Sequence, residues 1–218
     1  MQEEINIDVD LSGVISGYCY ASFSSGRKVL EETGFSLVSG EEHAYLGGTR
    51  VTKDSNFFKT GNWIKECCAW IPDYGAVLTR YSSFIEFPKI GEELHSKCHD
   101  FNLEEKLVKK ALEDCVKVEN PNILTEEFNK KPETRFLFGK YARDYGLKLK
   151  EMGIDSISIY APNSGKLAFA RPIFISEVHK SRLSERKLFR IICCLRTSEM
   201  DFAVRGIKRF GKNKSVIL

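Results

Sequence analysis

Residues 62–87 read NWIKECCAWIPDYGAVLTRYSSFIEF, and this stretch decides the predicted fold. Apolar residues are dense on both sides of the sequence PDYG at 72–75. That sequence suits a tight turn, because proline fixes φ and glycine accepts unusual backbone angles. We therefore expect an antiparallel hairpin of strands 62–71 and 76–87. Hairpins of this kind favour an antiparallel sheet over a doubly wound parallel sheet.

Further strands are expected on both sides of this hairpin. Alternating apolar residues predict strands at 5–11 and 13–23, and the pair Gly47-Gly48 predicts a short hairpin over 44–52. The same kind of pattern returns in the last third of the chain, at 154–161, 166–176, 187–197 and 201–210.

Two helices are expected in the middle of the chain. Residues 102–116 carry an apolar stripe at helical spacing, and a near match to a capping box opens this segment. A second helix is expected over 133–152. The sequence thus predicts an α+β fold in which antiparallel β-hairpins flank two central helices, in one compact domain or two closely packed subdomains.

The segment 119–132 is polar, contains two prolines and separates the two expected helices. We therefore predict three parts of the chain. Residues 1–118 form an acidic β-rich part that ends in an amphipathic helix, and residues 119–132 form a linker. Residues 133–218 form a helix and a basic β-rich part.

The formal net charge of +3 conceals a strong asymmetry along the 218 residues. Residues 1–100 carry 9 basic and 15 acidic side chains, residues 101–165 carry 11 of each, and residues 166–218 carry 13 basic and 4 acidic. A segment with a net charge of +9 and interleaved phenylalanines favours a polyanionic partner. Our leading hypothesis is therefore nucleic-acid binding, to RNA or single-stranded DNA.

Strand periodicity indicates which residues of the basic segment would bind. If the strands 187–197 and 201–210 form a hairpin, four arginines lie on one surface, and two lysines add charge nearby. These residues are Arg190, Arg196, Arg205, Arg209, Lys208 and Lys212. Guanidinium groups at strand spacing suit phosphate oxygens. Because no RNA-binding signature accompanies them, backbone contacts would dominate the binding.

A second hypothesis is a metal-dependent nuclease or phosphodiesterase. His95 and His99 are spaced to share one face of a helix and could hold a divalent ion together with Asp100. The basic surface would then guide the substrate, and the metal would be the only cofactor. The sequence leaves open whether the protein is an enzyme.

A third hypothesis is that the acidic and basic ends pair between chains, in a homo-oligomer or a larger complex. The seven cysteines include no Cys-x-x-Cys motif and read as buried free thiols of a reducing compartment. The acidic N-terminus does not resemble a signal peptide, and no apolar run is long enough to span a bilayer. We therefore expect a cytoplasmic protein without a membrane partner.

Overall fold

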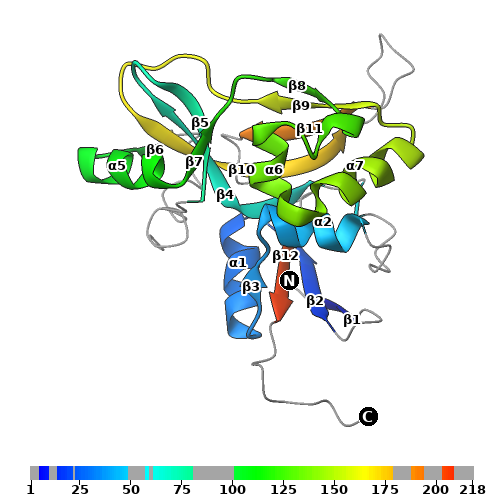
Figure 1. Cartoon of the computed structure of the whole chain (residues 1–218). Coiled ribbons are helices and arrows are strands. Elements are labelled where there is room, and N and C mark those ends of the chain that lie inside the picture. The colour runs from blue at the N-terminus through cyan, green and yellow to red at the C-terminus, as the bar shows by residue number, and fades with distance from the viewer. Residues whose placement is uncertain are drawn as a thin grey trace.

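The computed structural model describes residues 5–9, 14–21, 23–48, 57–58, 61–80, 101–178, 188–193 and 203–208. Its twelve described strands form one mixed sheet, whose main path runs β1-β2-β12-β4-β10-β11-β9-β8 (Figure 1). The strands are β1 (Asn6–Val9), β2 (Ile15–Tyr20), β3 (Ser36–Leu37), β4 (Asn62–Ile71), β5 (Gly75–Thr79), β6 (Phe101–Asn102), β7 (Cys115–Lys117), β8 (Asn122–Leu124), β9 (Ser156–Tyr160), β10 (Phe169–Val178), β11 (Leu188–Cys193) and β12 (Ala203–Lys208). The helices are α1 (Phe23–Glu32), α2 (Gly40–Gly48), α5 (Glu105–Glu113), α6 (Pro132–Phe138) and α7 (Ala142–Glu151), with short 3₁₀ turns η1 (Thr125–Glu127) and η2 (Gly139–Tyr141).

The predicted fold class, an α+β arrangement of antiparallel hairpins flanking two central helices, is wrong. Strands from both ends of the chain pair within one sheet. β12 lies between β2, with which it is antiparallel, and β4, with which it is parallel. β11 lies between antiparallel β10 and parallel β9. The alternation of apolar residues shows that a strand buries one face, but it does not identify the neighbouring strand.

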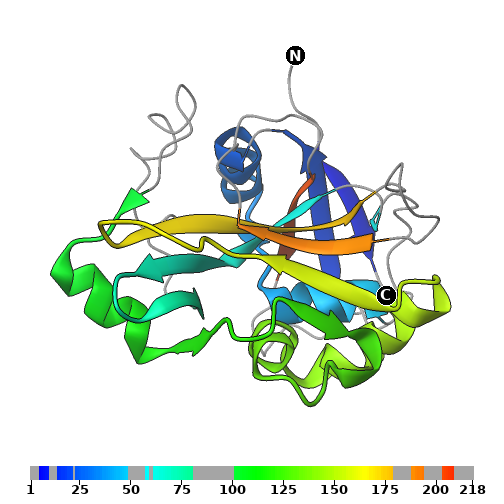
Figure 2. The same ribbon diagram turned by 90° about the horizontal axis from the view of Figure 1, so that it is seen from above.

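Helices pack on both sides of the sheet, with α1 on one side and α6 and α7 on the other (Figure 2). The largest core cluster lies on the side of α2, α6 and α7, where Tyr145 of α7 packs near Phe189 of β11. A second cluster joins Leu30 of α1 to Trp63 and Phe174 of the sheet. None of the described helices is long and apolar enough to cross a membrane. We call the two sides the α2 side and the α1 side.

α2 replaces the hairpin expected over 44–52, which is therefore wrong for the described residues of that range. The helix begins at a capping box. The backbone N–H of Glu42 donates to Oγ of Ser39 over 3.2 Å, and the backbone N–H of Ser39 donates to Oε2 of Glu42 over 2.8 Å. A Cβ on Gly47 would lie 2.9 Å from the ring of Tyr145, so glycine here allows α2 to approach α7 closely.

The helix expected over 133–152 is interrupted. Gly139, with a φ of 52°, ends α6, and η2 connects it to α7. Residues 119–132, predicted as a linker, contain β8 and η1, and Ile123 of β8 is fully buried in the core of the α2 side. The division of the chain into residues 1–118, 119–132 and 133–218 stays a prediction.

The hairpin of β4 and β5 is confirmed over its described residues. The two strands are antiparallel, and the turn between them uses positive φ at Asp73 (66°) and Gly75 (102°). Residues 81–87 of the expected second strand lie outside the described residues. Cys67 and Cys68 of β4 are buried free thiols, as predicted.

His43 of α2 is buried in the core beside two aromatic rings. Its Nε2 lies 2.9 Å from the hydroxyl of Tyr145, and its ring stacks on Phe57 at a centroid distance of 4.8 Å. Burial, and then the charge of Arg205, lower the pKa of His43 from 6.5 to about 3. The imidazole is therefore neutral at physiological pH.

Candidate functional site

Six of the residues predicted for a site lie outside the described part of the chain, and their roles stay predictions. They are the metal candidates His95, His99 and Asp100 and the basic residues Arg196, Arg209 and Lys212. Within the residues that the structure describes, no group of three or more His, Cys, Asp or Glu side chains is placed to hold a metal ion.

The structure does not bring the two described arginines of the predicted basic surface together. Arg190 lies on β11 and Arg205 on β12, and β4 and β10 separate these strands. Phe189 precedes Arg190 and points into the core of the α2 side, so Arg190 faces the other side. Val204 precedes Arg205 and belongs to the α1 cluster, so Arg205 faces the α2 side. The expected hairpin of these strands is wrong.

Arg205 is fully buried rather than exposed to solvent. Its guanidinium lies 4.6 Å from the ring centroids of both Tyr18 and Phe57, and its Nε donates to Oδ1 of Asn62 over 3.3 Å. Lys208, the remaining described residue of the prediction, is exposed, with its Nζ 5.5 Å from the ring centroid of Phe35. Of the predicted basic residues that are described, Arg190 and Lys208 reach solvent.

A polar row crosses four strands on the α1 side, where Arg190 lies. The register places Ser158 opposite Arg190 and Asn122 opposite Ser158. Ser176 of β10 lies opposite Arg190 on its other flank. The hydroxyl of Ser158 donates to Oδ1 of Asn122 over 2.8 Å. Short polar side chains therefore continue from β8 to β10, with one arginine among them.

The large side chain of this surface is Tyr160, at the end of β9. It is 48 % exposed, and the guanidinium carbon of Arg190 lies 5.0 Å from its ring centroid. This is a cation–π contact, which fixes the arginine against the ring. The Nε of Arg190 is buried and makes no hydrogen bond within the described residues. We call Asn122, Ser158, Tyr160, Arg190 and Ser176 the outer row.

Apolar residues anchor the outer row to the core of the α1 side. Ile192 lies opposite Tyr160 on one flank and opposite Phe174 on the other. Phe174 in turn pairs with the buried Trp63, and the two rings are 5.3 Å apart. Neighbouring side chains on β9, β11 and β10 thus connect the exposed Tyr160 to the packed cluster beneath α1. The surface stands on rigid strands rather than on a loop.

The alternation that predicts a strand at 154–161 also contains a local signal for the outer row. Residues 156–160 read SISIY, in which two isoleucines alternate with two serines and a tyrosine. Both isoleucines are buried, whereas Tyr160 is half exposed. Alternation of this kind predicts a strand with one solvent-exposed face. It does not show that Arg190, 30 residues later, joins the same face.

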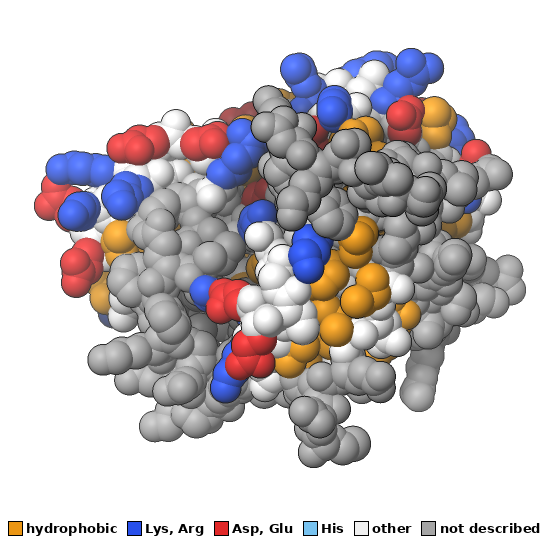
Figure 3. Space-filling view, turned by 90° about the horizontal axis from the view of Figure 1, so that it is seen from below, with side chains coloured by type: hydrophobic (Ala, Val, Ile, Leu, Met, Phe, Trp, Pro, Cys, Tyr) orange, Lys and Arg blue, Asp and Glu red, His pale blue; other side chains and the backbone are white. Residues whose placement is uncertain are grey.

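On the face seen from below, the described surface is mixed in charge (Figure 3). Figure 3 shows acidic and basic side chains intermixed on the face seen from below, beside a group of hydrophobic side chains. On the drawn part of that face, no continuous basic field extends across the described residues. The charge asymmetry of the sequence is therefore not visible there as a single basic track.

Comparison with known proteins identifies a structural likeness alone. No protein-family model matches the chain. No curated protein matches it in sequence. A solved structure described as "Accommodation of massive sequence variation in Nanoarchaeota by the C-type lectin fold" matches with a TM-score of 0.59 and 12 % sequence identity. The match covers 95 % of this chain and 98 % of that chain, and it shows that the two share a fold.

Proposed function

We propose that this chain is a recognition module that binds a protein partner through the outer row. The observation that carries the proposal is the exposed Tyr160 held against Arg190 on a rigid sheet face. Asn122 and Ser158 flank this pair with groups that donate and accept hydrogen bonds. An ordered aromatic residue and an arginine together supply the contacts that dominate many interfaces.

The composition of the outer row favours a protein over a nucleic acid. Tyrosine and arginine are enriched in protein–protein interfaces, and tyrosine, serine and asparagine are enriched in the binding loops of antibodies. Nucleic-acid affinity comes mainly from several cations that neutralise phosphates. The outer row contains one cation, Arg190, and Arg205 lies in the core. A neutral, hydrogen-bonding partner surface fits these side chains better than a phosphate backbone does.

The structural likeness supports the same proposal. The similar structure is described as a C-type lectin fold that accommodates massive sequence variation. A fold tolerates variation when the varied side chains lie outside its core. In this chain the outer row meets that condition, because adjacent residues on β9 and β11 fill the core of the α2 side while the outer row faces away from it.

A matched pair of variants tests the proposal. The double variant Tyr160→Ala with Arg190→Ala removes the exposed pair. Its control is Tyr74→Ala with Lys117→Ala, a second tyrosine–cation pair in which Nζ lies 5.6 Å from the ring centroid and Tyr74 is 44 % exposed. Both immobilised proteins and the wild type are used to capture partners from native lysate. Each captured protein is then purified, and its affinity is measured by calorimetry.

We expect at least one purified protein to lose roughly tenfold to hundredfold in affinity for the outer-row variant, since tyrosine and arginine hot spots contribute about 2 kcal/mol or more. Its affinity for the control variant should stay within about twofold. The proposal is overturned if every captured protein binds both variants equally well.

A second candidate function, nucleic-acid binding, rests on the +9 charge of residues 166–218. It is tested with a labelled single-stranded RNA and the same two double variants, over a range of salt concentrations. Binding that falls steeply with salt would favour this candidate over protein recognition. The metal-dependent nuclease, the homo-oligomer and the cytoplasmic location remain predictions from the sequence.

A further inference from the structure

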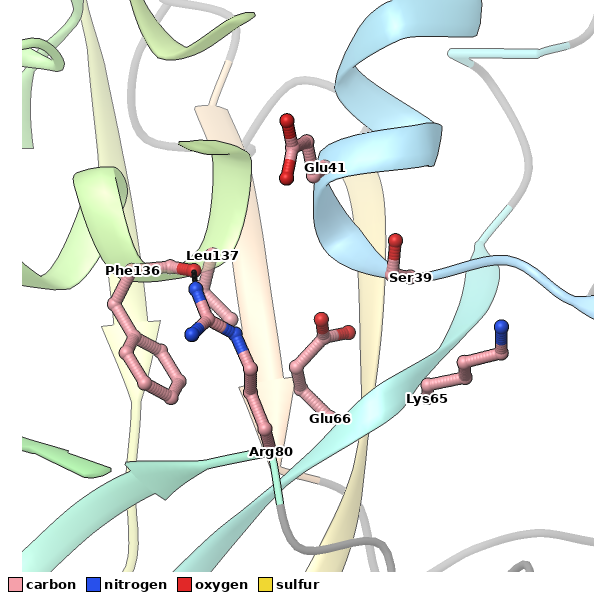
Figure 4. A pocket seen from close by; sticks show the side chains of 7 residues that line it. All are labelled: Ser39, Glu41, Lys65, Glu66, Arg80, Phe136 and Leu137. Carbon is pink, nitrogen blue, oxygen red and sulfur yellow. Dashed lines mark hydrogen bonds between the residues drawn. The ribbon is translucent and has the colours of Figure 1, made fainter. Parts of the chain in front are cut away.

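A cavity of about 320 Å³ lies on the α2 side, opposite the outer row. It opens where the start of α2 meets α6 and the strands β4 and β5. Two acidic and two basic side chains line it, together with a hydroxyl and an apolar wall. The lining residues are Ser39, Glu41, Lys65, Glu66, Arg80, Phe136 and Leu137 (Figure 4).

Glu66 is the buried charged group of this cavity, with 5 % of its surface exposed. Its Oε2 accepts the backbone N–H of Gly40, the first residue of α2, over 2.8 Å. Figure 4 shows its carboxyl group pointing toward α2, with Arg80 on one side and Lys65 on the other. Burial raises the pKa of Glu66 from 4.5 to about 7, against the lowering effect of that hydrogen bond.

Arg80 is held in place by Asp114, outside the cavity, and by Phe136 of the cavity wall. Its Nη2 donates to the carbonyl oxygen of Phe136 over 3.2 Å, and its Nη1 lies 3.3 Å from both carboxylate oxygens of Asp114. The guanidinium carbon also lies 4.6 Å from the ring centroid of Phe136. The arginine is therefore a preorganised cation at the cavity wall, and its position does not depend on a ligand.

The other charged groups are likewise separated from one another. Lys65 lies 3.7 Å from the carboxylate of Glu42, the capping residue of α2. Among the described residues, no ion pair joins Arg80 or Lys65 to Glu66 or Glu41. Each cation thus has a carboxylate partner outside the cavity, while within the cavity no ion pair joins either cation to Glu66 or Glu41.

We infer that this cavity binds a small zwitterion of the α-amino acid class. The carboxylate of the ligand lies toward Arg80, and its ammonium group lies toward Glu66. A ligand with both charges on adjacent atoms joins groups that the fold keeps apart. The cavity volume is at the small end of ligand pockets, about 300 to 1,000 Å³, and suits a molecule of this size.

Ligands with one kind of charge fit the cavity less well. An anion alone would lie against Glu66 and Glu41, and a cation alone would lie against Arg80 and Lys65. A neutral ligand would make no ionic contact with any of the four charged side chains that line the cavity. The zwitterion satisfies both signs at once, so electrostatics favour it over the three alternatives.

The pH dependence of binding follows from the charges around Glu66. Arg80 from the end of β5, Lys65 from β4 and Glu41 from α2 face it, and α6 contributes Phe136 and Leu137 without charge. Ionised Glu66 binds an ammonium group better than the protonated acid does. Affinity should therefore rise between about pH 6 and about pH 8, with uptake of the ligand accompanied by release of a proton.

Calorimetry on the full chain tests this inference, with the standard protein amino acids as probes at about pH 7.5. The best probe is then compared with its N-acetyl derivative, which lacks the ammonium group, and with its α-amide, which lacks the carboxylate. We expect each blocked form to bind about tenfold to hundredfold more weakly, the range for lost charged hydrogen bonds. If a blocked form binds as well as the free amino acid, or no amino acid binds below roughly 10 mM, the inference is overturned.

Two isosteric variants locate the binding. Glu66→Gln keeps an oxygen acceptor for the backbone N–H of Gly40 but removes the charge, so it should weaken binding about tenfold or more. Glu126→Gln, at an exposed pair with Lys150 outside the cavity, is the control and should leave affinity unchanged. Both variants are first checked by thermal unfolding. Equal affinity of the two folded variants would contradict the site.

Discussion

The two sides of the sheet differ in what covers them. On the α2 side, α2, α6 and α7 bury a large cluster that includes the inward residues of β9, β10 and β11. On the α1 side, α1 packs against the β2–β12 end, whereas Leu124 and Tyr160, at the β8–β9 end, are 47 % and 48 % exposed. The same strands therefore contribute to a closed core on one side and to an open surface on the other.

β11 shows this division within consecutive residues. Phe189 and Ile191 are buried in the core of the α2 side, and Arg190 and Ile192 between them face the α1 side. Substitutions at neighbouring positions should therefore affect either stability or the proposed recognition, but not both. One face of the sheet is thus open for binding where no described helix packs on it, while the opposite face of the same strands keeps its buried core.

The largest expected effect separates the two sides at adjacent residues. Phe189→Ala should destabilise the protein by about 3–5 kcal/mol, because it leaves a cavity beside Tyr145 in the core. Arg190→Ala should cost less than about 1 kcal/mol, since its side chain is partly exposed. Urea unfolding of both variants measures the difference. Equal losses of unfolding free energy in the two variants would contradict the assignment of Phe189 to a closed core and of Arg190 to an open surface.

The next effect concerns two buried titratable groups on the α2 side. The unfolded chain protonates His43 near pH 6.5, while the folded protein does so near pH 3, so His43 removes stability as pH falls below about 6.5. Glu66 acts in the opposite direction. Its pKa rises from 4.5 to about 7 on folding, so its contribution to stability is complete below about pH 4.5 and is lost as pH rises toward 7.

Single variants should reveal separately how His43 and Glu66 change the unfolding free energy with pH. In the Glu66→Gln protein, Glu66 no longer offsets the loss of stability that His43 causes as pH falls. The unfolding free energy of this variant should therefore decrease by about 2–3 kcal/mol between about pH 7 and pH 4.5. The His43→Gln protein should gain a similar amount over the same range. Chemical unfolding at several pH values tests both. A wild type and variants with the same pH profile would contradict the burial of these groups.

The smallest effect compares helix packing on the two sides. A Cβ on Gly146 of α7 would collide with the backbone carbonyl of Thr125, whereas a Cβ on Gly26 of α1 would meet the side chain of Val204. Because a side chain can shift and a backbone carbonyl cannot, Gly146→Ala should cost about 2–3 kcal/mol and Gly26→Ala about 1 kcal/mol. Thermal unfolding measures both. The reverse order would indicate that α1 is the more tightly fixed helix.

Local patterns in the sequence predicted individual strands well. The turn sequence at 72–75 identified the β4–β5 hairpin, and the apolar alternation at 187–197 and 201–210 indicated strands where β11 and β12 lie. The partners of those strands could not be read from the same patterns. β12 pairs with β2, about 190 residues earlier, and periodicity contains no information on such distant pairing.

The candidate sites were harder to predict because each assembles from distant segments. The spacing of Ser39 and Glu42 is typical of a capping box and indicates the start of α2, whereas Gly47-Gly48, inside that helix, favours a turn. The cavity unites Glu66 and Arg80 with that helix only because α6 packs beside it. Charge counts placed Arg205 on a surface, yet the ring faces of Tyr18 and Phe57 accommodate it in the core.

The place of β12 in the sheet has a consequence for how fast the chain folds. β12 lies between β2 and β4 near the middle of the sheet path, and its partners on β2 are about 190 residues earlier in the chain. Pairing of these strands must close a very long loop, which carries an entropic cost before any contact is gained. Completion of the sheet should therefore be slow compared with formation of the local β4–β5 hairpin.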